Sequence, residues 1–450
     1  MDNIYSFLKN LWEEINRESK KNISFFFAIL FVITIPLSLG INNICLVLLL
    51  ITLVVEHKKA SRLFSKSLIY PIVLFVIMCF SYLWSIDQLE TLKAIPKSVV
   101  LVLLPLVFLL FNPFSAIQIE KVKQYYSYAI VVYVLYFLLR AIIRFVLLKD
   151  SRVFYYHGDY NDDFGLVPKV LNAIHFSVFV SLAYFYFITK DYKSVMRKMV
   201  ISILFLFIIL LSSKNIILVF LVLNLVYFFF YSKAANKMRI RNLILLVAVM
   251  GMILFFGKIK QRFQEEFKTN TKRSIAHNVL EKTANDVHYV SIKEAWTNEK
   301  FTPNDFFPGT AFRVYQIRVF LELLKEEPIF WKGFGLNASY PKLEEKGKSY
   351  NVFLGDEKNE GYQKKNFHNQ YLQIFSELGI LGLVCLLVMV VISLKKGIIN
   401  KDFVHIAFSI LMISLFLTES FLSRQRGIVF FTLFYCLFNT NTTVKENNKL

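Results

Sequence analysis

The sequence predicts an all-α protein that crosses a membrane many times. Of its 450 residues, 56% are hydrophobic and only 19% are charged, and the mean hydropathy is +0.50. So little charge could not cover the roughly three soluble domains that this length would suggest. The apolar residues also fall in long runs that are separated by short polar segments. Together these observations exclude an ordinary cytosolic enzyme and favour a polytopic bundle of transmembrane helices.

The formal charge of +20 fits the same class of protein. The Lys and Arg residues form short clusters between apolar runs instead of covering one soluble face, so nucleic acid is not expected as a partner and membrane lipids are. The four cysteines lie inside apolar runs and lack the spacing of a zinc site or of a disulfide framework, so no metal is expected there. They are Cys45, Cys79, Cys385 and Cys436.

The first predicted element is an amphipathic helix over residues 1–21. Charged and apolar residues alternate here, which is unlike a cleavable signal peptide. Apolar residues from Ile4 to Ile15 recur at helical spacing on one face. We expect this helix to lie on the cytoplasmic surface of the membrane.

About twelve spans follow, nine within residues 22–256 and three within 371–440, although some are short for the ~20 residues that a bilayer needs. The apolar runs lie at 23–39, 41–55, 68–84, 98–112, 126–148, 170–189, 199–212, 215–231, 242–256, 371–394, 403–418 and 428–438. If the N-terminus is cytoplasmic, inside connections such as EHKKASRLFSKS are rich in Lys and Arg, whereas outside ones such as WSIDQLETLK and LTESFLSRQRG are less basic or carry balancing acids. The positive-inside bias therefore places both termini, including the 441–450 tail, in the cytoplasm.

Residues 257–370 break this pattern because they are polar and too long for a connector. In the predicted topology this large loop lies outside, and a polar loop of more than ~15 residues is usually functional or disordered. Its second half contains the helical segment AFRVYQIRVFLELLKEEP. The predicted apolar stripe of that helix consists of Ile317, Phe320, Leu321 and Leu324.

Arg313 lies on this predicted stripe and would point toward whatever the helix covers. A guanidinium can bind a phosphate or pyrophosphate through two parallel hydrogen bonds. Snorkelling, or a structural salt bridge, is the equally open alternative. Arg318 instead shares a face with Glu322, which favours a solvated ion pair, and Gly333 and Gly335 permit a tight turn back to the membrane.

His368 stands where the polar loop meets an apolar helix, in NFHNQYLQIFSELGILGL. At that position it could act as a base near neutral pH, and the free N–H groups of the helix would favour a bound anion. A lone histidine is more often structural, and that alternative stays open. No pair of histidines has metal-ligand spacing, so no metal site is expected.

Further cationic or imidazole side chains are predicted at the same outer edge of the membrane. Any one of them could simply anchor a helix at the head groups, but together they would suit a lipid-linked diphosphate because charge within a membrane usually faces a partner. They are Lys93, Lys97, Arg140, Arg144, His175 and Lys214.

These residues resemble a known family. The segment from Arg313 to Gly335, followed after an insert by HNQYLQIFSELGILGL, resembles the large periplasmic loop and next helix of the O-antigen ligase and polymerase superfamily. WSIDQLETLKAIPK and SSKN before a span match the same plan. The resemblance implies a metal-independent, cofactor-free glycosyltransferase of the GT-C type in the bacterial inner membrane. Such an enzyme takes a glycan from undecaprenyl diphosphate on the periplasmic side.

The resemblance also implies roles for single residues. The family's loop arginine falls on Arg313, which would hold the diphosphate, and its loop histidine falls on His368, which would take the acceptor hydroxyl's proton. Lys214 stands where the family usually has arginine. A compact ammonium group therefore replaces a planar guanidinium that can form two parallel hydrogen bonds. Weaker matches, across loops of different length, assign diphosphate contacts to Lys93, Lys97 and His175.

The acceptor separates the members of this superfamily. A single dominant outside loop near the C-terminus favours a ligase that uses a lipid A core sugar hydroxyl. The alternatives are a polymerase that uses another lipid-linked glycan and, less favoured, a protein O-oligosaccharyltransferase. A polysaccharide transporter or flippase is disfavoured because the two halves of the chain show no internal repeat.

Overall fold

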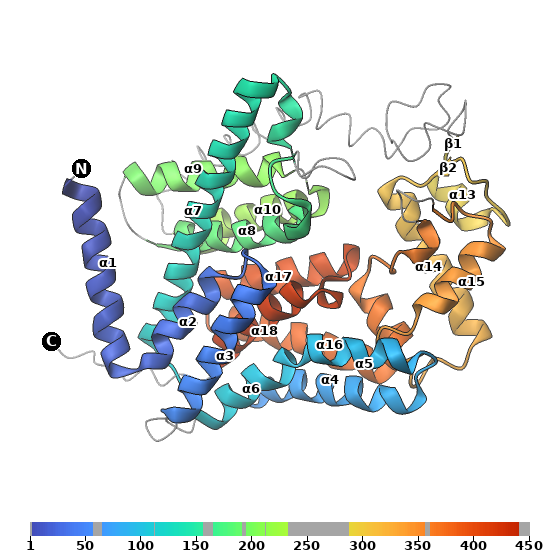
Figure 1. The fold of residues 1–450 in the computed structure, drawn as a ribbon, viewed down its shortest axis with the longest axis horizontal. Helices are drawn as coiled ribbons and strands as arrows, with labels where there is room; N and C mark the ends of the chain where they lie inside the picture. The colour runs from blue at the N-terminus through green and yellow to red at the C-terminus, as the bar shows by residue number, and fades with distance from the viewer. Residues whose placement is uncertain are drawn as a thin grey trace.

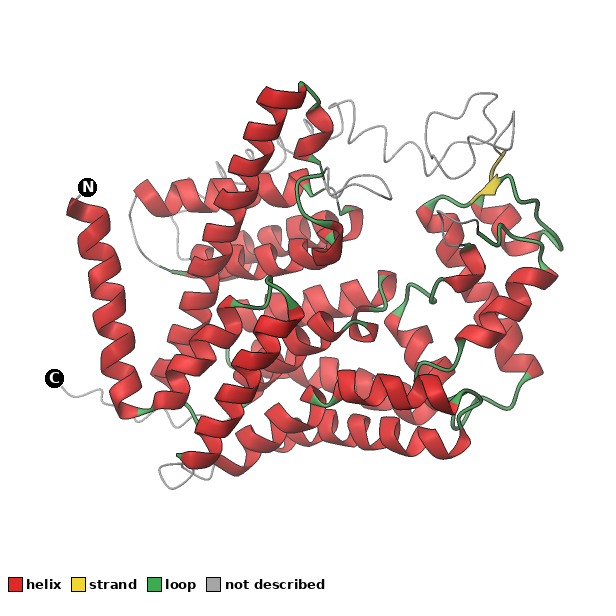
Figure 2. Ribbon diagram, viewed as in Figure 1, coloured by secondary structure: helices red, strands yellow, loops and turns green. Residues whose placement is uncertain are grey.

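The protein is a bundle of helices with a smaller helical unit at one end (Figures 1 and 2). The computed structural model describes residues 2–56, 65–111, 113–155, 165–190, 195–211, 213–232, 288–355 and 361–440. Within these residues the strands are limited to β1 (His288–Tyr289) and β2 (Asp305–Phe306), which pair in parallel. The predicted all-α class is confirmed for this part of the chain.

The helices occur in two groups along the chain. The first group comprises α1 (Asp2–Lys21), α2 (Ile23–Ile33), α3 (Leu39–Val55), α4 (Ile69–Phe80), α5 (Gln88–Ser98), α6 (Val100–Phe111), α7 (Ala116–Leu148), α8 (Ala173–Thr189), α9 (Val195–Leu210) and α10 (Lys214–Val226). The second comprises α13 (Ile292–Thr297), α14 (Gly309–Glu326), α15 (Tyr340–Ser349), α16 (Gln370–Ile399), α17 (Phe403–Thr418) and α18 (Gln425–Asn439).

Several helices are long and apolar enough to cross a membrane, which makes this a multi-pass membrane protein. The five such segments among the described residues are Lys66–Trp84, Gln88–Phe111, Ala116–Leu148, Lys214–Tyr231 and Gln370–Ile399. Helices α2, α3, α8 and α17 are apolar but shorter. The predicted run at 242–256 lies outside the described residues, as do 257–287 and 441–450, whereas each other predicted run falls on a helix. The total of twelve spans stays a prediction.

The two ends of the bundle are distinguished by their contacts. At one end, Ser65 Oγ and Lys396 Nζ both donate hydrogen bonds to Asn439 O, which joins the start of α4 to the ends of α16 and α18. At the other end, Thr91 Oγ1 of α5 donates to Leu336 O, 2.7 Å away. Leu336 belongs to the loop unit, which we define as residues 288–369, and we call this end of the bundle the loop-side end (Figure 1).

The loop unit has a core of its own, and this core determines which face of α14 is buried. The predicted stripe of Ile317, Phe320, Leu321 and Leu324 was wrong, because only Phe320 is buried and Leu321 is 38% exposed. The helix instead packs on the loop unit's aromatic side chains, and its buried face comprises Phe312, Tyr315, Gln316, Val319, Phe320 and Leu323.

The predicted pair between Arg318 and Glu322 is present, with Nε 3.0 Å from Oε1. It is enclosed instead of solvated, because the side chain of Arg318 is 14% exposed and its guanidinium lies over the ring of Tyr350. Burial alone would raise the pKa of the Glu322 carboxyl. Its hydrogen bonds to Tyr350, Lys346 and Arg318 hold that pKa below its ordinary value. Arg318 therefore stabilises the loop unit.

A break in α16 joins the loop unit to the bundle. Gly379 has φ 67° and ψ −165°, a conformation that is essentially restricted to glycine. The freed carbonyls of Ser376 and Glu377 accept hydrogen bonds from the N–H groups of Phe334 and Gly335, both at 2.8 Å. The predicted turn at Gly333 and Gly335 is confirmed, since their φ angles are 67° and 106°.

Substitution of Gly379 by alanine is expected to destabilise the protein. The new Cβ would lie 2.2 Å from Trp331 O in a backbone conformation that alone costs about 1–3 kcal/mol for other residues. The thermal unfolding temperature of purified Gly379→Ala in detergent should therefore fall. Gly40→Ala is the control, because a Cβ at Gly40 meets nothing within 4 Å. Equal unfolding temperatures for wild type and Gly379→Ala would contradict this account of the break.

Candidate functional site

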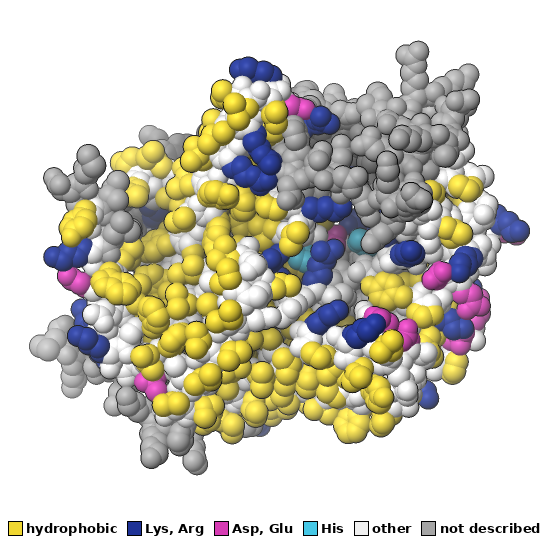
Figure 3. Space-filling model, in the orientation of Figure 1, with side chains coloured by type: hydrophobic (Ala, Val, Ile, Leu, Met, Phe, Trp, Pro, Cys, Tyr) yellow, Lys and Arg dark blue, Asp and Glu magenta, His cyan; other side chains and the backbone are white. Residues whose placement is uncertain are grey.

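Positive charge gathers on one face of the molecule. Figure 3 shows Lys and Arg side chains around a hollow near the middle of this face, and His side chains are visible within it. In the same orientation, α10, α14 and α17 are drawn around this part of the view (Figure 1). The contacts of individual residues define what meets there.

One carboxylate joins the two residues that were predicted as catalytic. Glu419 directly follows α17, and its side chain is only 13% exposed. Its Oε1 lies 3.5 Å from Arg313 Nη2, and its Oε2 lies 3.7 Å from His368 Nδ1. Arg313 comes from α14 and His368 from the residues before α16, so Glu419 brings together two elements that are distant in the sequence.

Arg313 is fixed by backbone carbonyls as well as by Glu419. Its Nε and Nη2 donate to Thr418 O at 3.2 and 3.0 Å, and its Nη1 donates to Gly309 O at 3.1 Å. The side chain remains 31% exposed. The structural salt bridge that the sequence left open is therefore present, and part of the Arg313 side chain remains accessible to solvent.

His368 occupies an unusual backbone conformation, with φ 46°. Its N–H donates to Asn366 Oδ1 at 3.0 Å, and the ring of Phe312 contacts its imidazole edge-on. Such conformations are uncommon for residues other than glycine and tend to occur at functional sites. Because Nδ1 faces Glu419, the neighbouring carboxylate favours the tautomer with a proton on Nδ1. Nε2 then carries the lone pair of a base.

The environment of Glu419 keeps it negatively charged. Burial alone would raise the pKa of this carboxyl, but contact with His368 and the nearby charge of Arg313 hold the pKa below its ordinary value. The group is therefore ionised at neutral pH and remains so while the pH falls through the usual range of glutamate.

Lys214 is placed near the same turn by the contacts of Asn215, the next residue in the chain. Lys214 is the first residue of α10, and Asn215 Nδ2 donates to Thr418 Oγ1 at 2.8 Å and to Ser414 O at 2.9 Å. Thr418 is also the residue whose carbonyl accepts the bonds from Arg313. The start of α10 is thus held beside the end of α17.

The other predicted residues are not in direct contact with Glu419 in the structure. His175 is 2% exposed and is covered by the ring of Phe421, 4.6 Å away, so it lies behind the turn instead of on the open surface. Lys93 and Lys97 are exposed on α5, and Lys93 Nζ pairs with Glu90 at 2.7 Å. Arg313 and His368 therefore meet at the end of α17, and the start of α10, which carries Lys214, lies beside it. His175 lies beneath the turn that follows.

Glu419 was not singled out from the sequence. It lies in LTESFLSRQRG, where it was interpreted only as an acid that balances the charge of an outside connection. The local signal was a lone acid immediately after an apolar run. Gln370 Oε1 adds to the site by accepting a hydrogen bond from Leu422 N at 2.6 Å, which fixes the turn after α17 against the start of α16.

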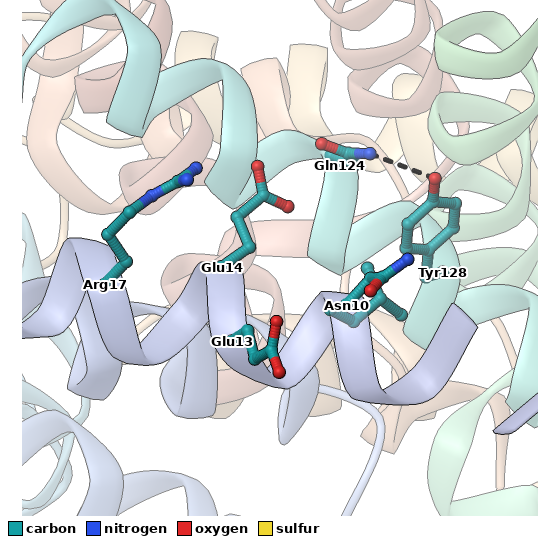
Figure 4. A pocket seen from close by; sticks show the side chains of 7 residues that line it. Asn10, Glu13, Glu14, Arg17, Gln124 and Tyr128 are labelled. Carbon is teal, nitrogen blue, oxygen red and sulfur yellow. Dashed lines mark hydrogen bonds between the residues drawn. The ribbon is translucent and has the colours of Figure 1, made fainter. Parts of the chain in front are cut away.

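No group of three or more His, Cys, Asp or Glu side chains that could hold a metal occurs among the described residues. A pocket of about 530 Å³ lies between α1 and α7 (Figure 4), away from the predicted site residues. Its lining comprises Asn10, Leu11, Glu13, Glu14, Arg17, Gln124 and Tyr128. The predicted first helix is present as α1 and is attached to α7 by Glu14, which pairs with Lys121 at 3.0 Å.

Comparison with known proteins supports the family resemblance. No curated protein matches the chain. The family model described as O-antigen ligase matches residues 199–387, a region that includes Lys214, Arg313 and His368. This family of glycosyltransferase-like ligases and polymerases supports an enzyme that acts on a glycan. The match supports the resemblance to the O-antigen ligase superfamily that the motifs of the sequence indicate.

Proposed function

We propose that the protein is an O-antigen ligase-like glycosyltransferase of lipopolysaccharide assembly. It moves a glycan from undecaprenyl diphosphate to a sugar hydroxyl of the lipid A core. The observation that supports this most strongly is the meeting of Arg313 and His368 at Glu419, at the loop-side end of the bundle. In this proposal the protein is in the bacterial inner membrane, residues 257–370 face the periplasm, and residues 1–21 and 441–450 face the cytoplasm.

The proposed reaction is a direct displacement at the anomeric carbon. Nε2 of His368 takes the proton of the acceptor hydroxyl while the hydroxyl oxygen forms a bond to that carbon. The bond from the carbon to the diphosphate oxygen breaks, and undecaprenyl diphosphate leaves with the electron pair. The configuration at the anomeric carbon is thereby inverted. Glu419 orients the imidazole and stabilises the imidazolium that forms.

Cationic side chains compensate the charge that develops on the diphosphate. Arg313 and Lys214 are the proposed direct partners, and Lys93 and Lys97 of α5 are proposed at the edge of the site. His175 is buried under Phe421, so it is not proposed as a direct partner of the diphosphate. Diphosphate is already a good leaving group, so the positioning of two lipid-anchored substrates supplies much of the rate. The proposed mechanism uses neither a metal nor a cofactor.

Arg313→Lys should lower the rate of glycan transfer by about 10-fold, because lysine keeps the charge but loses the planar fork. It cannot reproduce the paired bonds from Nε and Nη2 to Thr418 O. Initial rates in membranes with equal amounts of protein measure the effect. Arg318→Lys is the control on the same helix, since Arg318 pairs with Glu322 inside the loop unit. Wild-type rates for Arg313→Lys would contradict its proposed role.

The acceptor is tested in a strain that lacks this protein. Accumulation of long glycan that is not attached to lipid A core indicates a ligase, which is the result that we expect. Lipid A core that carries only single repeats would indicate the polymerase of the same superfamily instead. A glycan profile identical to that of the parent strain would contradict both activities.

A further inference from the structure

The guanidinium of Arg313 is already well occupied within the protein. It donates to the carbonyls of Thr418 and Gly309 and lies 3.5 Å from the carboxylate of Glu419. A diphosphate that enters the site therefore meets a cation whose charge is partly neutralised. Additional positive charge without an acidic partner would bind such a group more effectively.

Arg424 is a positively charged side chain without an acidic partner among the described residues. It precedes α18, its N–H donates to Phe421 O at 3.4 Å, and its own carbonyl accepts from Ile428 N at 3.1 Å. The backbone is thus held while the side chain is exposed, and its guanidinium forms no hydrogen bond or ion pair with the residues that the structure describes. Other exposed or partly buried arginines differ, since Arg152 pairs with Asp150 at 2.8 Å and Arg318 pairs with Glu322 at 3.0 Å.

The position of Arg424 connects it with the site. Its charge acts on the imidazole of His175, as do the charges of Glu419 and Arg426. Phe421, which covers His175, lies in the same turn three residues earlier in the chain. Arg424 and Glu419 are therefore at opposite ends of one short turn that passes over His175.

Arg426 adds a second positive charge at this place. Its side chain is 9% exposed, and it donates to Ile35 O at 3.1 Å and to Leu37 O and Val170 O at 2.8 Å. These acceptors are carbonyls, and no carboxylate in the described part of the chain pairs with it. The positive charge of Arg426 is thus held in position and is not neutralised by a protein anion.

A lysine on the neighbouring helix is likewise a cation without an acidic partner. Helix α5 packs against α18, and Lys97 is exposed on α5. Lys93 on this helix pairs with Glu90, whereas Lys97 has no ion pair within the described ranges. Arg424, which directly precedes α18, and Lys97 of α5 are thus unneutralised cations on elements that adjoin each other.

We propose that Arg424 binds a phosphate group of a lipid-linked substrate, with Arg426 as a fixed positive charge behind it and Lys97 beside it. The inference rests on the proposed function and extends it to a residue outside the predicted set. A guanidinium and a phosphate form two parallel charge-assisted hydrogen bonds, which suits an exposed arginine next to the reacting groups. The phosphate belongs either to the diphosphate of the donor or to a phosphorylated sugar of the acceptor.

Ligand binding to purified protein in lipid nanodiscs tests this proposal. The probes are undecaprenyl diphosphate, undecaprenol without phosphate, and an acceptor glycolipid with and without its phosphates. Arg424→Gln should weaken the binding of a phosphorylated probe by about 10-fold, because it loses charge-assisted hydrogen bonds. The phosphorylated probe that loses affinity identifies the source of the phosphate. Arg152→Gln is the control and should bind every probe as the wild type does.

Unchanged affinity of Arg424→Gln for both phosphorylated probes would overturn the proposal, as would an equal loss for the probes without phosphate. If Arg424→Gln unfolds, Arg424→Lys replaces it and should retain part of the affinity because it keeps the charge. His368→Ala separates this inference from the proposed function, since that variant should bind undecaprenyl diphosphate normally and transfer nothing. Transfer by His368→Ala would refute the proposed function without changing the binding result for Arg424.

Discussion

His368→Ala is expected to abolish measurable glycan transfer, with a fall in rate of about 10²–10⁴-fold, the usual contribution of a general base. Alanine cannot accept the proton of the acceptor hydroxyl. The side chain is 32% exposed at the end of a loop, so its loss should leave the amount of protein and its insertion into the membrane unchanged. Transfer rates and protein amounts in the same membranes measure both effects.

His288→Ala is a closely matched control for this prediction. His288 lies in the same loop unit, its side chain is 34% exposed, and its Nε2 lies 3.3 Å from Glu294 Oε1. It therefore has a similar exposure and a similar acidic neighbour, but it does not contact Glu419 in the structure. Normal transfer by His368→Ala, or an equal loss in His288→Ala, would contradict the assignment of His368 as the base.

Glu419→Gln should also lower kcat strongly, by about 10²-fold or more. The amide has a similar shape, but it has no negative charge to stabilise an imidazolium, and its N–H₂ group can favour the wrong tautomer of His368. It also removes the charged partner of Arg313. Steady-state kinetics on purified protein measure kcat. Glu344→Gln is the control, because Glu344 pairs with Lys348 on the exposed surface of α15.

The effect of Glu419 on stability has a defined dependence on pH. Its folded-state pKa is lowered, so its contribution to stability is present above the unfolded-state pKa of glutamate and is lost as the pH falls through the folded-state value. Wild type should therefore unfold at a higher temperature than Glu419→Gln at neutral pH, and the two should converge in acid. If Glu419→Gln has the kcat of the wild type, and if the two proteins unfold at the same temperature at every pH, the proposed contacts of Glu419 are refuted.

Local sequence patterns could predict the helices because each apolar run carries its own signal. Arg313 and His368 could be singled out in the same way, since each lies in a short motif next to a helix. The turn at Gly333 and Gly335 was also predictable, but its contact with the break at Gly379 was not. That contact depends on how two distant segments pack, which neither segment's composition specifies.

The errors at α14 and at Glu419 have a similar origin. The apolar stripe of α14 was assigned as if the helix covered a membrane, whereas its partner is the aromatic core of the loop unit. Glu419 was interpreted as a charge that balances a connection, because nothing in its neighbourhood in the sequence indicates that Arg313 and His368 lie beside it. A carboxylate whose partners come from several elements becomes visible only in the fold.

Purified protein in detergent tests the central claim most directly, when it is mixed with an undecaprenyl-diphosphate-linked glycan and a lipid A core acceptor in the presence of a metal chelator. The account predicts that the glycan is joined to the acceptor with inverted anomeric configuration, that undecaprenyl diphosphate is released in equal amount, and that His368→Ala forms no product. Retention of the anomeric configuration, a requirement for added metal, or failure of folded wild-type protein to form any product would contradict it.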